Sequence, residues 1–314
     1  MTGSVLTFGE TMGLVRATGI GGWDVARQAE VGIGGADSNV AIGLVRLGVP
    51  TTWIGRVGAD SLGRLVRREL LAEGVRALVT EDPDHPTGVM LKEKRTSGST
   101  QVLFHRRGSA GSRLGPEDVP AEEVRRSALV HVTGITPALS SSARAATEAV
   151  LTVAREAGIP IAFDVNHRSA LWIDGDAGEL YRSIAARADL VFAGEDEARL
   201  MVDGRAPEAL AREIAALGPR EVIIKLGARG SLVLADGVVR EQPAHVISVV
   251  DSVGAGDAFV AGYLAALLRG GSVADRLASG TAAGAFACMA PGDWEGSPRT
   301  HELRLLTEVE PVAR

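Results

Sequence analysis

Apolar residues recur with two alternating spacings along most of the chain. Short runs rich in β-branched residues predict strands, and longer segments with apolar residues three or four positions apart predict helices. Several predicted helices end at a glycine, as at Gly48, Gly74 and Gly158. Such alternation is typical of the α/β class, with a mainly parallel sheet and helices on both of its faces. The predicted strands are residues 5–8, 51–57, 129–132, 160–165, 190–192, 221–226 and 230–234, and the predicted helices are residues 38–47, 62–73, 142–157, 207–217, 256–268 and 273–289.

This alternation is interrupted between residues 87 and 107. Two β-like runs, at 88–92 and 101–106, follow each other without a helix, and the polar residues 96–99 predict a turn between them. A hairpin in such a chain could be a lid over a binding site or an addition to the edge of the sheet, and the pattern favours neither. Without an internal repeat, a low-complexity linker or a shift in composition, we predict a single domain over residues 1–314, with a lid from about 10–18 and 87–107.

Composition and charge exclude several classes of protein. The chain has one cysteine, Cys288, so it forms no internal disulfide, which fits a reducing compartment. The N-terminus does not resemble a signal peptide, and no apolar run reaches the ~18 residues that a membrane span needs, so we expect a cytoplasmic protein without a membrane partner. A net charge of -6 and an aromatic content of 4% argue against a nucleic-acid partner.

The candidate with the clearest chemistry is the sequence Asp-Ser-Val-Gly-Ala-Gly-Asp at residues 251–257. It lies between a β-branched run at 246–250, which predicts a strand, and the apolar helix predicted from residue 256. Glycines at a strand-to-helix turn let backbone N–H groups approach an anion, and the helix N-terminus adds a positive dipole end. Asp257 could take a proton from an attacking hydroxyl beside that anion. Taken alone, the motif favours a plain helix cap over a catalytic carboxylate.

Three further stretches place polar residues at predicted turns. Residues 225–231 follow an apolar strand, where glycines could let a nucleotide lie on the backbone, although a simple hairpin explains them too. Residues 34–41 precede a helix, where Asp37 and Asn39 could bond ligand hydroxyls, although a helix start capped by Asp37 or Ser38 is the alternative. Residues 164–168 follow another strand, at the end where open α/β sheets bind ligands. There Arg168 could grip a carboxylate or phosphate, or form a surface ion pair.

In order and spacing, these four stretches resemble the ribokinase or PfkB family of carbohydrate kinases over about residues 5–296. The resemblance implies a ribokinase-like fold with a small β lid, with ATP and Mg²⁺ as cofactors. It also implies that Asp257 is the catalytic base. The residues that it assigns besides this base are Gly254, Ala255 and Gly256 in the anion hole, Asn166, Lys225, Gly227, Gly230, Gly254 and Gly256 at the nucleotide, and Glu197 at the metal. Gly194 stands where the family often has Asn, and Ser252 stands where it usually has Thr.

Within the family, the likeness is greatest to 2-keto-3-deoxygluconate kinases. It rests on Arg-Arg-Gly-Ser-Ala at 106–110 and on residues 164–168, because the matching arginines of those kinases hold an acid sugar. Those kinases usually carry tyrosines on the lid. At the corresponding places this chain has Met90 and the run Leu-Phe-His at residues 103–105. The substrate residues implied by the resemblance are Gly34, Gly35, Asn39, Met90, His105, Arg106, Arg168, Asp257 and Asp293.

We therefore predict a kinase that transfers the γ-phosphate of ATP to a hydroxyl of a small sugar or sugar acid, with 2-keto-3-deoxygluconate as the best match. One alternative is a kinase of the same family for a neutral sugar such as fructose or ribose, or for a nucleoside. Another, from a different class, is a catalytically inactive sugar-binding regulator. Exposed faces of a lid hairpin can pair, so a homodimer or a higher homo-oligomer is compatible with the sequence.

Overall fold

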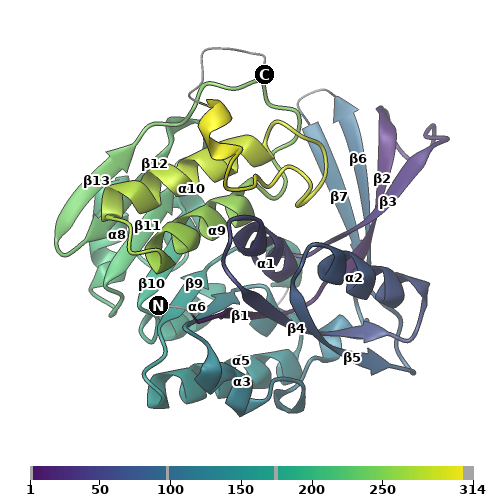
Figure 1. Ribbon diagram of the computed structural model, residues 1–314, viewed down its shortest axis with the longest axis horizontal. Helices are drawn as coiled ribbons and strands as arrows, with labels where there is room; N and C mark the ends of the chain where they lie inside the picture. The colour runs from purple at the N-terminus through teal and green to yellow at the C-terminus, as the bar shows by residue number, and fades with distance from the viewer. Residues whose placement is uncertain (1–2, 97–98, 173–175, 307–314) are drawn as a thin grey trace.

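The computed structural model describes residues 3–96, 99–172 and 176–306. Within these residues the chain forms a nine-stranded sheet and a four-stranded sheet (Figure 1). The larger sheet comprises β1 (Val5–Phe8), β4 (Thr51–Gly58), β5 (Arg76–Asp82), β8 (Leu129–Thr133), β9 (Ile161–Asp164), β10 (Leu190–Gly194), β11 (Glu221–Lys225), β12 (Ser231–Ala235) and β13 (Val238–Gln242). The smaller one, which we call the lid sheet, comprises β2 (Met12–Ile20), β3 (Ala29–Gly34), β6 (Val89–Thr96) and β7 (Ser99–His105).

The strands of the larger sheet run in the order β13-β12-β11-β10-β9-β8-β1-β4-β5. Neighbours from β11 to β5 are parallel, whereas β12 and β13 are joined antiparallel at one edge. The carboxyl ends of the parallel strands therefore meet along one edge, where open α/β sheets bind their ligands. The predicted mainly parallel sheet is confirmed.

Helices cover both faces of the larger sheet (Figure 1). They are α1 (Ala36–Arg46), α2 (Ser61–Ala72), α3 (Ala121–Arg126), α4 (Thr136–Leu139), α5 (Ser141–Glu156), α6 (Ala177–Ala185), α7 (Glu195–Ala198), α8 (Pro207–Ala215), α9 (Ala255–Leu268) and α10 (Val273–Ala287). The first strand shows why two layers form. Val5 packs with residues of α1, α9 and α10, whereas Leu6 and Phe8 pack with residues of α5, α6 and α8. Because alternate side chains of a strand face opposite sides, each fully buried one contributes about 1.5–3 kcal/mol to a different layer.

The lid sheet has the order β3-β2-β6-β7 and stands at the upper right in Figure 1, above β4 and β5 of the larger sheet. The predicted hairpin is confirmed, since β6 and β7 pair antiparallel with Leu91 opposite Leu103. Of the turn predicted at 96–99, residues 97–98 lie outside the described part of the chain. The strand β3, at Ala29–Gly34, was not predicted. Met12, Leu14 and Met90 form the buried face of this sheet.

One local prediction is wrong, and so is one alternative that the sequence left open. Residues 246–250 form no strand, because Val246 is fully exposed and Val249 and Val250 are each more than a third exposed, so these β-branched side chains are not packed in a sheet. The first helix begins at Ala36 with Gly35 as its N-cap, so neither Asp37 nor Ser38 caps it. The Asp37 carboxylate instead accepts hydrogen bonds from Thr7, Thr133 and Thr136 inside the protein.

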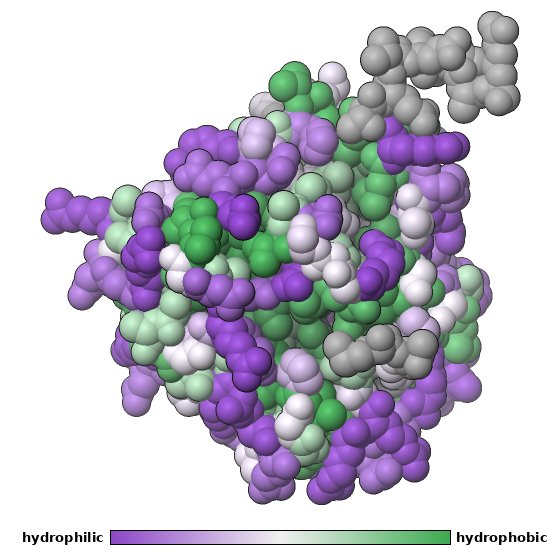
Figure 2. Space-filling view, turned by 60° about the vertical axis from the view of Figure 1, so that its left-hand side comes forward, coloured by the Kyte–Doolittle hydropathy of each residue, from purple (hydrophilic) through white to green (hydrophobic). Residues whose placement is uncertain are grey.

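Among the helices of residues 3–96, 99–172 and 176–306, none combines the length and apolar character needed to cross a membrane. Hydrophilic and hydrophobic residues are interspersed on the face shown in Figure 2.

Candidate active site

Asp257 lies in the first turn of α9 and its side chain is buried, with 6% of its surface exposed. One carboxylate oxygen accepts a hydrogen bond from Asn39 Nδ2 of α1 (2.8 Å), and the other accepts one from Asn166 Nδ2, just beyond β9 (3.0 Å). Asn166 has a φ of 40°, a left-handed conformation that Asn tolerates better than most residues. The carboxylate is thus oriented by two distant segments, and it does not cap its own helix.

The protonation of Asp257 is tuned by its surroundings. Burial raises the pKa of this carboxyl to about 6, and the negative charge of Asp164 acts in the same direction. The hydrogen bond from Asn39 and the positive charges of Arg168 and Lys225 oppose that rise. A carboxylate with a pKa close to neutrality is well suited to accept a proton, because it is both ionised and basic at physiological pH.

Residues 254–256 form the turn at which α9 begins. Gly254 is the N-cap, with a φ of 77°, and a Cβ added to it would overlap the backbone carbonyl oxygen of Asp293. Only glycine therefore fits this position without strain. Gly256 has more room, since an added Cβ would meet only Lys225 Nζ, at 3.7 Å. The turn places the positive end of a 14-residue helix dipole beside Asp257, as an anion-binding site requires.

A group of charged residues gathers at the carboxyl ends of β9, β10 and β11. Lys225 Nζ lies 2.7 Å from Asp164 Oδ1 and 3.9 Å from Glu197 Oε2. Burial opposes the charged form of Lys225, but the charges of Asp164 and Glu197 outweigh it and raise the pKa of this lysine. The ammonium thus stays positive close to the glycine turn, where it can attract a phosphate.

Glu197 was predicted to face the metal. One of its oxygens accepts the backbone N–H of Gly194 (2.6 Å), and the other accepts that of His167 (2.9 Å). Among the described residues, no group of three or more His, Cys, Asp or Glu side chains forms a ready-made metal site. A carboxylate oxygen is nevertheless the donor that Mg²⁺ prefers, and Mg²⁺ commonly takes most of its other ligands from phosphates and water. That Glu197 binds the metal remains a prediction, and a carboxylate is the type of donor that such a role requires.

The stretch 225–231 is a hairpin connection between β11 and β12, as one of its two interpretations held. Gly227 and Gly230 both have positive φ, at 58° and 102°. A Cβ on Gly230 would overlap the Gln242 carbonyl oxygen, whereas one on Gly227 would meet nothing within 4 Å. Gly227 therefore leaves open backbone beside Lys225, and a nucleotide contact there stays a prediction.

Several predicted substrate residues meet where β3 leads into α1. A Cβ on Gly34 would overlap both the carboxylate of Asp293 and the end of Met90, so these three residues are in direct contact. Gly35 is equally confined, because a Cβ there would overlap the Glu10 carbonyl oxygen. The two glycines thus let the lid sheet and the loop after α10, which contains Asp293, approach the start of α1.

The two arginines expected to hold an acid sugar have different surroundings. Arg106 is largely buried, and its Nε donates to Glu10 Oε2 at 2.6 Å, so a carboxylate already balances its charge. Arg168 is exposed and donates to the His167 carbonyl oxygen. Its positive charge lowers the pKa of Asp257. His105 is exposed at the end of β7. Arg168 is therefore the freer of the two cations.

Two residues of this region were missed by the sequence analysis. Glu10 lies two residues after β1 and accepts hydrogen bonds from Arg106 and Ser109. Its position after a strand end is the signal that also marked Asp164. Lys92 lies on β6 with 1% of its side chain exposed, and it contacts Asp293. The sequence signal for Lys92 was its place two residues after Met90, because residues two apart in a strand lie on the same face.

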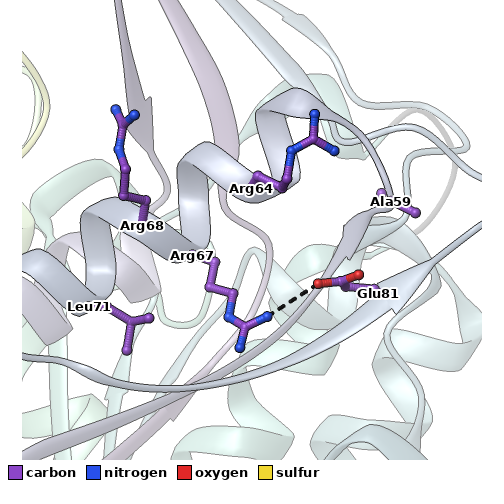
Figure 3. A pocket seen from close by; sticks show the side chains of 7 residues that line it. Ala59, Arg64, Arg67, Arg68, Leu71 and Glu81 are labelled. Carbon is purple, nitrogen blue, oxygen red and sulfur yellow. Dashed lines mark hydrogen bonds and ion pairs between the residues drawn. The ribbon is translucent and has the colours of Figure 1, made fainter.

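A pocket lined by residues of α2 and β5 lies apart from these side chains (Figure 3). It contains none of the predicted site residues. Figure 3 shows Arg67 directed toward Glu81, while Arg64 and Arg68 point away from it. These arginines do not converge on one point, so the pocket is not the candidate site.

The fold and the site define a class. A buried carboxylate at a glycine-rich helix start, on the carboxyl edge of a parallel sheet, is suited to phosphoryl transfer to a hydroxyl. The sequence matches the pfkB family of carbohydrate kinases over residues 3–299, and the chain belongs to this family. It is thus an ATP-dependent phosphotransferase, which argues against an inactive regulator.

The curated relatives differ in substrate. A 2-dehydro-3-deoxygluconokinase of Bacillus subtilis (strain 168) is 37% identical over 95% of this chain and 93% of its own. A 2-dehydro-3-deoxygalactonokinase of Haloferax volcanii is also 37% identical, over 93% of each chain. A fructokinase of Escherichia coli is 35% identical over 86% of this chain and 90% of its own. Family membership therefore does not fix the sugar.

Solved structures share the fold. A PfkB protein from Polaromonas sp. JS666 is 33% identical, with a TM-score of 0.87 over 96% of this chain and 99% of its own. A ribokinase II candidate from E. coli, solved with ATP and Mg²⁺, has a TM-score of 0.91 at 24% identity, over 97% of this chain and 99% of its own. The expected ribokinase-like fold with a lid sheet is confirmed.

Proposed function

We propose that this PfkB kinase phosphorylates a 2-keto-3-deoxy sugar acid, with 2-keto-3-deoxygluconate as its first candidate. The observation that carries the chemistry is Asp257, which is held between Asn39 and Asn166 beside the glycine turn. The choice of an acid sugar is supported by the exposed Arg168 close to this base. It is also supported by the two relatives at 37% identity that act on 2-keto-3-deoxy sugar acids.

In the proposed mechanism, Asp257 takes the proton of the sugar hydroxyl as that oxygen attacks. The backbone N–H groups of residues 254–256 and the N-terminus of α9 stabilise the negative charge that develops on the transferred group. Lys225 adds a positive charge near the same turn. ATP, with Mg²⁺, supplies the phosphoryl group, and Glu197 would be the carboxylate nearest that metal. Asn166 and the open backbone at Gly227 would contact the nucleotide.

Substrate recognition would be shared between the lid sheet and the body. Arg168 would pair with the sugar carboxylate, and Arg106 would add hydrogen bonds while Glu10 keeps it in place. Gly34, Gly35 and Asn39 would approach the sugar from the start of α1, and Met90, His105 and Asp293 would line the lid side. A closed lid would exclude water, which otherwise competes as the phosphoryl acceptor.

A neutral sugar is the second candidate. It is favoured by the Glu10–Arg106 ion pair, which leaves one uncompensated arginine where two were expected. It is also favoured by the fructokinase at 35% identity.

The test is ATP consumption by the purified protein with magnesium, comparing 2-keto-3-deoxygluconate, 2-keto-3-deoxygalactonate, fructose, ribose and adenosine. We expect turnover with one or both keto acids and little with the neutral compounds. In Arg168→Met, kcat/KM for the keto acid should fall by roughly 10- to 100-fold, because a charge-assisted hydrogen bond is lost. Preference of the wild type for fructose or ribose would discard the acid-sugar proposal and keep the kinase.

A further inference from the structure

Lys92 is a buried charge outside the residues assigned above. It lies on β6 of the lid sheet, and 1% of its side chain is exposed. Its Nζ donates to the backbone carbonyl oxygen of Gly292 (2.7 Å) and to Asp293 Oδ1 (3.3 Å). It also lies 2.8 Å from Asp251 Oδ2. Lysine is almost never buried without such compensation, since removing an ammonium from water is costly.

The oxygens around Lys92 come from two loops that are far apart in sequence. Asp251 precedes α9, and the segment of Gly292 and Asp293 follows α10. The ammonium of Lys92, on the lid sheet, therefore connects the loop before α9 with the loop after α10.

Both loops contact the turn that begins α9. Asp251 Oδ1 accepts the backbone N–H of Val253, one residue before Gly254. The backbone of Asp293 packs so closely on Gly254 that a Cβ there would overlap its carbonyl oxygen. Any shift of either loop would thus displace the N–H groups of residues 254–256. A displacement of ~1 Å at such a site can cost about 100-fold in rate.

We propose that Lys92 is a positioning residue for phosphoryl transfer, whose ammonium holds the two loops and so fixes the glycine turn against the lid sheet. This inference rests on the proposed kinase chemistry of that turn. Lys92 itself touches neither Asp257 nor the turn amides in the contacts described above. Its effect is therefore on kcat, through the position of the anion hole, more than on the affinity for the sugar.

The experiment compares Lys92→Ala with the wild type, using whichever sugar of the panel the wild type phosphorylates best. We expect kcat to fall by roughly 10- to 100-fold, with a much smaller change in KM for the sugar. The alanine leaves space for the missing propyl ammonium group. n-Propylammonium chloride should therefore restore part of the lost kcat with a saturating dependence, whereas tetramethylammonium chloride at the same ionic strength should not.

Two further variants separate positioning from general stability. Lys92→Met fills the space without a charge, so it should lose kcat and gain nothing from propylammonium, and it serves as the test if the alanine variant does not fold. Arg276→Met breaks another partly buried ion pair, with Glu221 at the opposite end of β11, and it should lower the melting temperature without lowering kcat. The proposal is overturned if a folded Lys92→Met keeps the kcat of the wild type, or if both ammonium salts act alike on the alanine variant. Turnover of a neutral sugar by the wild type would refute the proposed substrate and still allow this comparison.

Discussion

At the scale of single residues, the protonation of Asp257 should control the reaction. Burial raises the pKa of this carboxyl to about 6, and only the ionised form can accept the proton of the sugar. We therefore expect kcat/KM to fall tenfold per pH unit below about pH 6 and to be level above it, which a pH–rate profile measures. Asp257→Asn should lower kcat by about 10²–10⁴-fold.

Arg168 offers a sharper check of the same assignment. Its positive charge lowers the pKa of Asp257, so its removal in Arg168→Met should move the acidic limb of the profile to higher pH. Arg64→Met removes an exposed arginine from α2 and should leave the limb in place. An acidic limb that stays put in Arg168→Met would mean that another group is titrating.

Asp37 makes a separate prediction about stability. It is buried, and burial raises its pKa to about 7 against a usual 3.8. The folded protein therefore holds a proton that the unfolded chain releases, so this group's contribution to stability falls as pH rises from about 4 to 7. Relative to the wild type, Asp37→Asn should gain about 2–4 kcal/mol in free energy of unfolding between pH 5 and pH 8.

Urea titrations at the two pH values measure this gain. The neighbouring His131 works in the opposite sense, because burial lowers its pKa to about 3 and destabilises the fold as pH falls below 6.5. It is present in both proteins, so it largely cancels in the difference. Asp196→Asn, a change of an exposed carboxylate on α7, is the matched control. Parallel pH dependences of Asp37→Asn and the wild type would contradict the prediction.

At the scale of elements, the start of α9 can be tested with two alanines that differ in one respect. Gly254→Ala forces a left-handed residue against the Asp293 carbonyl, so it should lower the free energy of unfolding by about 1–3 kcal/mol or more. Gly256→Ala meets only Lys225 Nζ and lies within a helix, where alanine is favoured over glycine by about 1 kcal/mol. The Gly256→Ala variant should be as stable as the wild type but have a lower kcat, because the added methyl group enters the anion site.

Denaturation curves and kcat for the two variants are the measurements. If Gly256→Ala kept full activity, the anion would not bind at this turn. If Gly254→Ala were as stable as the wild type, the close packing of the C-terminal loop on α9 would be wrong.

The elements that could be predicted are those whose own pattern determines their burial. The strands β9 and β10 are buried apolar runs, and α5 carries a regular apolar stripe, so all three were found. β2, β3 and β13 are partly exposed, so their sequences lack the continuous apolar run that marks a buried strand. The opposite error occurred at residues 246–250, where β-branched residues have no strand to pair with. Strand propensity mostly reflects packing, so it fails where a neighbour is missing.

The same distinction holds for the site. Asp257 and Lys225 were recognised from short motifs and strand ends. The residues that orient or compensate them could not be paired from the sequence, because the pairs span the chain. Asn39 reaches Asp257 across 218 residues, and Lys92 reaches Asp293 across 201. The alternation along its strand could indicate that Lys92 is buried and needs an oppositely charged partner. It could not indicate which residue that partner is.

At the scale of the whole molecule, two ion groups tie the lid sheet to the body. Arg106 of the lid segment pairs with Glu10 after β1, and Lys92 pairs with the loops around α9 and α10. Predicted substrate residues lie on both parts. A sugar that bound between them would add contacts that the unfolded chain lacks, so it should stabilise the entire fold by mass action.

We therefore expect 2-keto-3-deoxygluconate, added without ATP, to raise the melting temperature of Asp257→Asn, a variant whose turnover should be strongly reduced. At a concentration of 100 times Kd, a ligand adds about 2.7 kcal/mol to the free energy of unfolding. In a chain of 314 residues that corresponds to a rise of roughly 4 °C. Fructose should give no comparable rise, since it has no carboxylate for Arg168, and gluconate tests whether any sugar acid suffices. An equal rise with fructose would show that binding does not depend on the carboxylate. That result would move the substrate assignment to neutral sugars even before any turnover is measured.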